Sequence, residues 1–240
     1  MASSLRILCW NIAEGRVRPG ALNNIAARIR QKSPDIVLLN EVKKDGWWWP
    51  RDMDHARDIS RMTGLSHYAF GGVNGTGITG HKGVAVISRY PLGTSRVHHV
   101  IYNKKKTGFG TLATTITIDG QTHHILSTRF APHNTEQNKA ENPVGISQAL
   151  ELVSSFDSGA PLIFGGDFNA STNPEATEYE SVMKRFLDES GLKEVLADRP
   201  DDRVDYLFYR GEYRVSEVEF LRPQPEVSDH PWIFAVLERD

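Results

Sequence analysis

The chain has 240 residues, an ordinary composition for a soluble globular protein and a formal net charge of -2 at pH 7. These properties exclude a protein held to nucleic acid by bulk positive charge, although they are compatible with a local basic groove. No apolar run approaches the roughly 20 residues of a membrane span, and no linker divides the chain, so one domain over residues 1–240 is expected. No secretory signal is evident and Cys9 is the only cysteine, which favours a cytoplasmic location, with a processed secreted form as the alternative.

The first strand is predicted over residues 5–11 and ends in the amide side chain of Asn11. Apolar residues at helical spacing follow, and Pro34 closes that helix. The next apolar run, residues 36–41, ends in the carboxylate of Glu41. A strand–helix–strand order predicts two parallel strands, so Asn11 and Glu41 are expected at the same edge of a sheet, where open α/β folds keep their sites.

The next segment is predicted to contain a loop, a helix and a second loop. The tripeptide Trp47-Trp48-Trp49 is interpreted either as a satellite apolar cluster or as a substrate-contacting surface. A helix is expected over residues 51–63 and a strand over residues 84–87. The Gly-rich stretch over residues 71–83 is expected to be a flexible loop. It is not a phosphate-binding P-loop, because no Gly-Lys-Ser/Thr sequence opens a helix after it.

From residue 94 onward the pattern predicts antiparallel strands, near residues 94–101, 109–118 and 121–128. The tight turn Asp119-Gly120 joins the last two. A loop containing Lys104-Lys105-Lys106 joins the first two. Such a lysine triplet is more typical of a solvated hairpin tip than of a nucleic-acid contact.

The strand predicted from residue 162 ends in Gly165-Gly166-Asp167-Phe168-Asn169, with an amphipathic helix expected on either side. Because side chains alternate along extended backbone, Asp167 and Asn169 are expected to face the same way at the mouth of the strand. The carboxylate can take a proton while the carboxamide donates hydrogen bonds to an anion. An Asx-turn uses the same residue types and explains this stretch equally well when it is considered alone.

The last quarter adds two more polar strand ends. Asp205 opens the apolar run over residues 205–208, and Asp229-His230 precedes the final strand over residues 232–237. A lone histidine at this place is typical of a structural residue. With Asp229 beside it and Asp205 available to orient it, His230 is interpreted as part of the reacting site.

Amide, acidic and imidazole side chains therefore stand at the ends of the apolar strands: Asn11, Glu41, Asp167, Asn169, Asp205, Asp229 and His230. If these ends converge, four carboxylates share a small volume, and two charges about 4 Å apart repel by roughly 4 kcal/mol at an effective dielectric near 20. A hard divalent cation, Mg²⁺ or Mn²⁺, fits these oxygen ligands, whereas zinc draws more His or Cys. Such a cation beside an Asp/His pair suits attack of water on phosphorus.

Six short motifs occur in a fixed order along the chain: Cys9-Trp10-Asn11, Leu39-Asn40-Glu41, residues 83–91, Gly166-Asp167-Phe168-Asn169, Val204-Asp205-Tyr206 and Ser228-Asp229-His230. Together they resemble the endonuclease/exonuclease/phosphatase superfamily, which includes DNase I, abasic-site endonucleases, sphingomyelinases and inositol-polyphosphate 5-phosphatases. The resemblance spans residues 7–232. It implies an α/β fold, namely a four-layer α/β/β/α sandwich of two packed mixed β-sheets with the site at one edge.

The resemblance also implies a role for each residue of the site. Divalent metal binding is assigned to Glu41 as the main ligand, helped by Asn11 and Asp229. Asp167 would position or deprotonate the attacking water, and Asn169 would hold a phosphate oxygen. His230, oriented by Asp205, would stabilise the charge that develops on the scissile phosphate. Whether Asp167 or His230 is the general base stays open.

Arg129 departs from the family pattern, because many members have His at its position and abasic-site endonucleases have Tyr. The role there is hydrogen bonding to phosphate, which a guanidinium performs with a fixed positive charge. Activity is therefore expected to survive, with a flatter acid limb in its pH profile. A catalytically weakened relative is the alternative.

A nuclease that cleaves phosphodiester bonds of nucleic acid is the first interpretation of function. Lys82, Lys104-Lys105-Lys106, Arg129 and the tryptophan tripeptide can supply phosphate contacts and stacking, although the slightly acidic net charge opposes this. A phosphatase or phosphodiesterase for a small molecule or lipid headgroup is the alternative, with Trp47-Trp48-Trp49 touching a membrane surface. A non-enzymatic binding module is the third interpretation.

Overall fold

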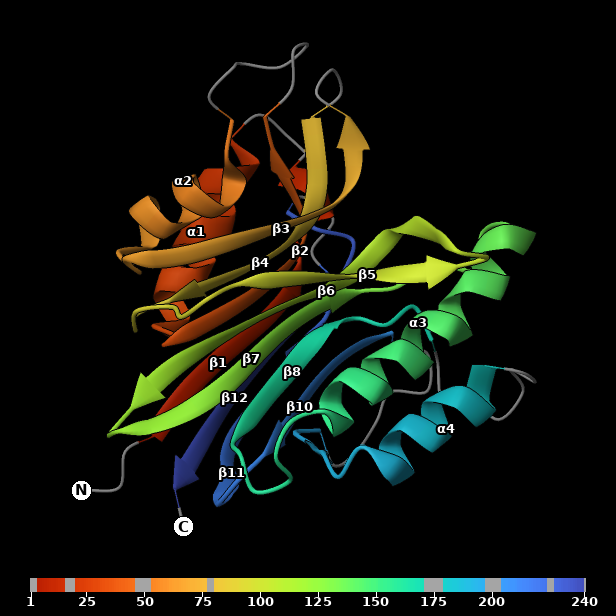
Figure 1. Ribbon diagram of the computed structural model, residues 1–240. Helices are drawn as coiled ribbons and strands as arrows, with labels where there is room; N and C mark the ends of the chain where they lie inside the picture. The colour runs from red at the N-terminus through yellow and green to blue at the C-terminus, as the bar shows by residue number, and fades with distance from the viewer. Residues whose placement is uncertain are drawn as a thin grey trace.

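The computed structural model describes residues 4–15, 20–45, 53–76, 80–170, 179–196, 204–223 and 227–239. Within these ranges two six-stranded β-sheets pack face to face, and a pair of helices covers the outer face of each sheet (Figure 1). None of the described helices is long and apolar enough to cross a lipid bilayer. The predicted four-layer α/β/β/α sandwich of two mixed sheets is confirmed.

The first sheet contains the predicted βαβ unit. Its strands, in spatial order, are β11 (Tyr213–Leu221), β12 (Trp232–Arg239), β1 (Ser4–Asn11), β2 (Ile36–Lys44), β4 (Gly80–Ser88) and β3 (His67–Thr76). Strands β1 and β2 are parallel and are joined through α1 (Ala21–Lys32), whereas the other neighbours are antiparallel. Asn11, the last residue of β1, pairs with Asn40 and lies beside Glu41 as predicted, but β2 continues beyond its predicted end at residue 41 to Lys44.

The second sheet contains the predicted antiparallel strands. Its spatial order is β5 (Arg96–Tyr102), β6 (Lys105–Ile118), β7 (Gln121–Arg129), β8 (Leu162–Asp167), β10 (Asp205–Arg210) and β9 (Lys193–Glu194). Strands β7 and β8 form its one parallel pair among the described strands, with α3 (Glu136–Ser154) in the connection. Asp119 and Gly120 both have positive φ, as the two-residue hairpin turn between β6 and β7 requires.

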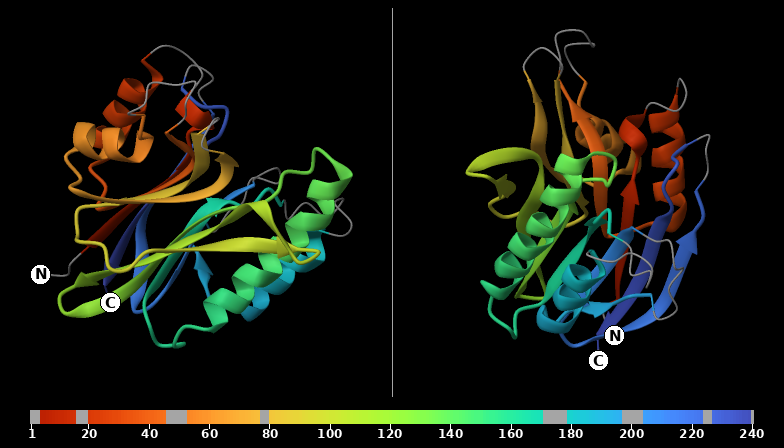
Figure 2. Two further views of the ribbon diagram at one scale, coloured as in Figure 1. Left: turned by 45° about the horizontal axis from the view of Figure 1, so that its top comes forward. Right: turned by 90° about the vertical axis from the view of Figure 1, so that its right-hand side faces the viewer.

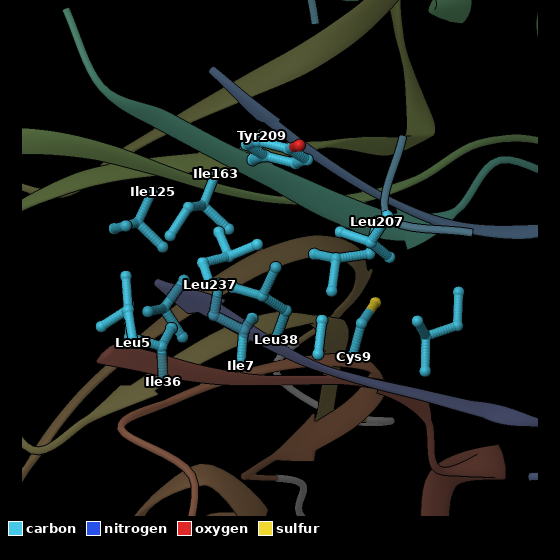
Figure 3. Close-up of a cluster of buried hydrophobic side chains, with 14 of the residues drawn as sticks. Leu5, Ile7, Cys9, Ile36, Leu38, Ile125, Ile163, Leu207, Tyr209 and Leu237 are labelled. Carbon is cyan, nitrogen blue, oxygen red and sulfur yellow. The ribbon is translucent and has the colours of Figure 1, made fainter. Parts of the chain in front are cut away.

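The hydrophobic core lies in three layers that follow from strand alternation. On β1, Ile7 and Cys9 face the second sheet, whereas Leu8 and Trp10 pack with the residues under α1. Figure 3 shows Ile7 and Cys9 in the cluster between the sheets, together with side chains of β8 and β10 from the opposite sheet. Because both faces of β1 are buried, its sequence is a continuous apolar run.

The outer layers are two pairs of helices, with α1 and α2 (His55–Thr63) over the first sheet and α3 and α4 (Tyr179–Glu189) over the second (Figure 2). The helix predicted over residues 51–63 is described from His55 onward. Its N-cap is Asp54, whose side chain accepts a hydrogen bond from the Arg57 backbone N–H, a cap typically worth about 1 kcal/mol. The tripeptide Trp47-Trp48-Trp49 lies outside the described residues.

The prediction of a flexible loop over residues 71–83 is wrong for the described residues, because residues 71–76 belong to β3 and residues 80–83 to β4, and the two strands pair. Gly71 pairs with Val84, and Gly72 pairs with Gly83. A Cβ atom on Gly83 would lie 1.9 Å from the carbonyl oxygen of Gly71. Glycine is therefore present here because two backbones approach closely within a sheet, which also places Lys82 on β4.

Candidate active site

Residues from both sheets meet where β1, β7 and β8 end and where β2 has a bulge. Asp167 lies in register with Arg129 of β7 on one side and with Asp205 of β10 on the other. The amide of Asn11 joins the two sheets, because its Nδ2 donates to Asp167 Oδ2 at 3.0 Å. The structure thereby brings these predicted residues together with three more: Glu41, Asn169 and His230.

Glu41 is located at a β-bulge of β2. The register with β4 shifts between Asn40 and Val42, and Glu41 has a φ of 54°, a left-handed conformation that costs a non-glycine residue roughly 1–2 kcal/mol. Arg129 Nη2 donates to Glu41 Oε1 at 2.8 Å, and Lys82 Nζ lies 3.2 Å from Oε2. Burial favours the protonated carboxyl, but the charges of Arg129 and Lys82 outweigh it and hold the pKa of Glu41 below its usual value.

Asp167 is the most buried acid of the site, with 1% of its surface exposed. Its Oδ2 accepts from Asn11, and its Oδ1 accepts from the backbone N–H of Asn169 at 3.1 Å. Burial, followed by the charge of Asp205, raises the pKa of Asp167 to about 7. This carboxylate can therefore exchange a proton near neutral pH.

Asp205 and His230 form a hydrogen-bonded pair, with 2.9 Å between Asp205 Oδ2 and His230 Nδ1. Ser228 anchors the backbone of this segment, because its hydroxyl donates to the carbonyl oxygen of Asn11 and accepts from the His230 N–H. Burial favours the neutral ring, but the hydrogen bond and charge of Asp205, with the charge of Asp167, raise the pKa of His230 to about 9. The Nε2 atom lies 3.3 Å from Asn11 Nδ2, so it faces the middle of the site.

Asn169 lies at the site, but a turn places it there and not the strand alternation that the sequence predicts. β8 ends at Asp167, and Asn169 has a φ of 48°, so extended alternation does not place the two side chains. The Asn169 backbone N–H instead bonds Asp167 Oδ1, which is the Asx-turn alternative. The Asn169 side-chain Nδ2 donates to the Phe130 carbonyl oxygen at 3.0 Å. The Asx-turn thus holds Asn169 beside Asp167, so the turn and the functional interpretation of these two residues are compatible.

Sequence analysis missed two residues that support the site, Glu14 and Lys43. Glu14 is 5% exposed, has a φ of 59°, and lies 2.7 Å from Lys43 Nζ through Oε2 and 2.7 Å from Lys82 Nζ through Oε1. Burial opposes ionisation, but the hydrogen bonds and charges of Lys43 and Lys82 lower the pKa of Glu14 to about 2. Glu14 therefore holds Lys82 in place beside Glu41. No periodicity marks such a residue in the sequence.

Replacing Glu14 with Gln is expected to lower the free energy of unfolding by about 3 kcal/mol at pH 7. The folded pKa of about 2 lies below the ordinary 4.5, so this stabilisation is complete above pH 4.5 and is lost as pH falls toward 2. Urea unfolding of both proteins between pH 7 and pH 3 measures the difference. Glu136→Gln, at a side chain 89% exposed, is the control and should change stability by less than about 0.5 kcal/mol. A deficit that is equal at pH 7 and pH 3 would contradict the prediction.

The remaining predicted residues lie at the surface or outside the described ranges. Asp229 is exposed beside His230, and its charge contributes to the raised pKa of the ring. Lys104, Lys105 and Lys106 are exposed at the β5–β6 hairpin. The role of Asp229 as a metal ligand stays a prediction.

The site carries more negative than positive side chains. Its carboxylates are Glu14, Glu41, Asp167, Asp205 and Asp229, and its cationic partners are Lys43, Lys82, Arg129 and the imidazole of His230. One ligand atom each of Asp167, Asp205 and His230 lies within 4.8 Å of the other two. This surplus of carboxylate oxygens fits a hard divalent cation with oxygen ligands.

Known proteins share the fold and parts of the sequence. Residues 8–230 match the model of the Endonuclease/Exonuclease/phosphatase family. An endonuclease/exonuclease/phosphatase from Beutenbergia cavernae has a TM-score of 0.83 and 22% identity, over 98% of this chain and 72% of that chain. The catalytic domain of human nocturnin has a TM-score of 0.75 and 19% identity, over 100% of this chain and 98% of that chain. The uncharacterized protein YbhP of Escherichia coli K12 is 26% identical over 175 residues, 69% of this chain and 67% of YbhP.

Proposed function

The chain belongs to the endonuclease/exonuclease/phosphatase family, whose members are hydrolytic phosphoesterases, and we propose that it is a divalent-metal-dependent phosphodiesterase acting on nucleic acid. One observation carries the proposal. The Asn11 amide donates to buried Asp167 and lies beside the Asp205–His230 pair at the sandwich edge where Arg129 meets Glu41. The cytoplasmic location expected from the lone Cys9 is part of the same proposal.

The donor set of the site fits Mg²⁺ or Mn²⁺. Glu41, with Asn11 and Asp229, would hold the cation, which when bound supplies positive charge that polarises a phosphoryl oxygen and makes water more acidic. Several carboxylates lie close together here, and burial of Asp167, followed by the charge of Asp205, raises the pKa of Asp167. A divalent cation would relieve that repulsion.

Asp167 and His230 would move the protons of the reaction. The pKa of Asp167 is about 7 without the cation, and a bound cation would lower it and favour the ionised carboxylate, which can accept a proton from an attacking water at neutral pH. Asp205 fixes the ring of His230 through Nδ1, which leaves Nε2 to donate to a phosphate oxygen when it is protonated. The pKa of about 9 keeps that proton present at neutral pH.

Arg129 and Asn169 would position the phosphate. The Nε atom of Arg129 is buried and donates to no atom of the described residues, and a phosphate oxygen would satisfy it. Asn169 uses one side-chain N–H on the Phe130 carbonyl and keeps a second N–H for a substrate oxygen. Both residues would therefore hold phosphate with donors that the fold has placed in advance.

A metal-dependent activity screen tests the proposal. Single-stranded DNA, nicked DNA, RNA, bis-p-nitrophenyl phosphate and p-nitrophenyl phosphate are offered with Mg²⁺ or Mn²⁺, and with EDTA. We expect diester cleavage that EDTA abolishes and that Glu41→Ala reduces to the EDTA level, while Glu189→Ala, at an exposed side chain of α4, stays at the wild-type level. Equal activity in EDTA would refute the metal mechanism. Faster cleavage of the monoester than of any diester would support the phosphatase alternative instead.

A further inference from the structure

A groove of about 1010 Å³ lies beside the candidate active site. The β5–β6 hairpin forms one wall through Tyr102, Lys105, Lys106 and Phe109, and the first turns of α3 form another. Figures 1 and 2 show the tip of this hairpin next to the start of α3. The volume is at the upper end of the roughly 300–1,000 Å³ that small-ligand pockets have, so the groove can hold one nucleotide with room at its ends.

Two contacts connect the groove to the candidate active site. Phe109 lines the groove, and its ring centre lies 5.4 Å from the guanidinium carbon of Arg129, which in turn binds Glu41. On α3, the buried Asn142 follows Glu141 of the groove lining and donates through Nδ2 to the carbonyl oxygen of Phe168 at 3.0 Å, between Asp167 and Asn169. A chain with its phosphate at Arg129 would therefore continue into the groove.

The groove has opposite charge on its two walls. Lys105 and Lys106 are exposed and form no ion pair with the described residues. On α3, Glu136 pairs with Lys139 at 2.6 Å, and Glu141 accepts from Gln137 at 2.7 Å. The hairpin wall thus suits one phosphate, whereas the acidic wall disfavours a compact polyphosphate or an anionic membrane surface.

The aromatic residues add a preference for unpaired bases. Tyr102 is half-buried in the same wall as the two lysines, so part of its side chain is exposed to the groove. A ring of this kind stacks on a nucleobase only when the base has left its own stack. Carboxylate and amide groups of the opposite wall can accept hydrogen bonds from base N–H groups.

We propose that this groove binds the nucleotide next to the scissile phosphate of a single-stranded nucleic acid, with Lys105 and Lys106 on the adjoining phosphate and Tyr102 against the base. The inference rests on the proposed function and specifies its substrate as single-stranded. It assigns the lysines of the hairpin a binding role, in place of the solvated tip that the sequence favours.

The first test is binding without catalysis. Fluorescence anisotropy of a fluorescein-labelled eight-nucleotide oligothymidylate is measured in EDTA over a range of salt. The double variant Lys105→Ala, Lys106→Ala is expected to bind roughly tenfold more weakly at low salt. Its slope of log affinity against log salt should be smaller by about 0.7, the value for the one phosphate contact that it loses. Tyr102→Leu should weaken binding about tenfold without changing the slope.

The matched control is Lys184→Ala, Lys193→Ala, which removes the same charge from exposed lysines outside the groove and should bind as wild type does. Equal losses in the two double variants, or binding of a duplex as tight as that of the single strand, would overturn the inference. So would binding of inositol hexakisphosphate or phosphatidylserine vesicles that depends on Lys105 and Lys106 while oligothymidylate binding does not.

Kinetics separate this inference from the proposed function. Bis-p-nitrophenyl phosphate is too small to reach the hairpin, so its kcat/KM should be unchanged in the double variant, whereas KM for the oligonucleotide should rise about tenfold with kcat preserved. If wild type cleaves the small diester and KM for the oligonucleotide is unchanged, only the inference fails. If wild type cleaves neither substrate while groove-dependent binding persists, the proposed function fails.

Discussion

Replacing Asp167 with Asn is expected to lower the turnover of a phosphodiester by about 10²–10⁴-fold, the range typical of a positioned acid–base group. The carboxylate is 1% exposed and has a pKa of about 7, so it is the acid of the site best suited to take a proton near neutral pH. An amide of the same shape keeps the acceptor for the Asn169 N–H, at 3.1 Å in the wild type, but accepts no proton. The loss should therefore appear in kcat.

A stability measurement distinguishes this loss from misfolding. The folded pKa of Asp167 is raised, so the stability that the protonated carboxyl contributes is complete below pH 3.8 and is lost as pH rises through about 7. In metal-free protein, the melting temperature of wild type should therefore fall relative to that of Asp167→Asn as pH rises from 5 to 8. Asp188→Asn, at an exposed carboxylate of α4, should change neither activity nor this pH dependence. A turnover within threefold of wild type would remove Asp167 from the proton transfer.

The sheets and the meeting of the polar strand ends were predictable because both depend on local patterns. Residues 5–11 and 36–41 read as apolar runs ending in polar side chains, and a parallel βαβ connection leaves those ends at one edge. This reasoning needs only strand order and the direction of each strand. It therefore predicted that Asn11 and Glu41 lie at one edge, whereas Asp167 lies on the other sheet and its place beside them was implied only by the family resemblance.

The local geometry of the site was not predictable, because tertiary contacts override the alternation rule there. Glu14, Glu41 and Asn169 all have positive φ, and none is glycine. The bulge at Glu41 depends on how β2 pairs with β4, and the turn at Asn169 depends on the Asp167 carboxylate. Such strained residues persist only where surrounding structure holds them, so their sequence carries no signal.

The sequence pattern did not predict β3, the first residues of β4 or β11. β3 and the start of β4 are rich in glycine, which reads as a loop unless the pairing of two backbones is known. β11 is an edge strand whose alternation breaks at a bulge between Val215 and Glu217, and several of its side chains face solvent. Charged exposed residues are typical of an edge that avoids pairing with another chain.

Replacing Arg129 with Ala is expected to change turnover and metal affinity in opposite directions. The guanidinium lies 2.8 Å from Glu41 Oε1, so a divalent cation at Glu41 must bind beside a fixed positive charge. Removing that charge should tighten the binding of Mn²⁺ to substrate-free protein about tenfold or more. Turnover should nevertheless fall by about 10–100-fold, because the phosphate loses a charge-assisted donor worth roughly 1.5–3 kcal/mol.

Titration calorimetry with Mn²⁺ and steady-state kinetics on the same preparations measure both effects. Arg129→Lys is the matched variant, because it keeps the charge and removes the planar fork of donors. Its metal affinity should stay near that of wild type while its turnover falls. Lys82 provides a second comparison, since it also contacts Glu41 but is held by Glu14, so Lys82→Ala should tighten Mn²⁺ binding as well. If Mn²⁺ binds Arg129→Ala no more tightly than wild type, Glu41 is not the ligand that Arg129 competes for, and the assignment of the metal to Glu41 is wrong.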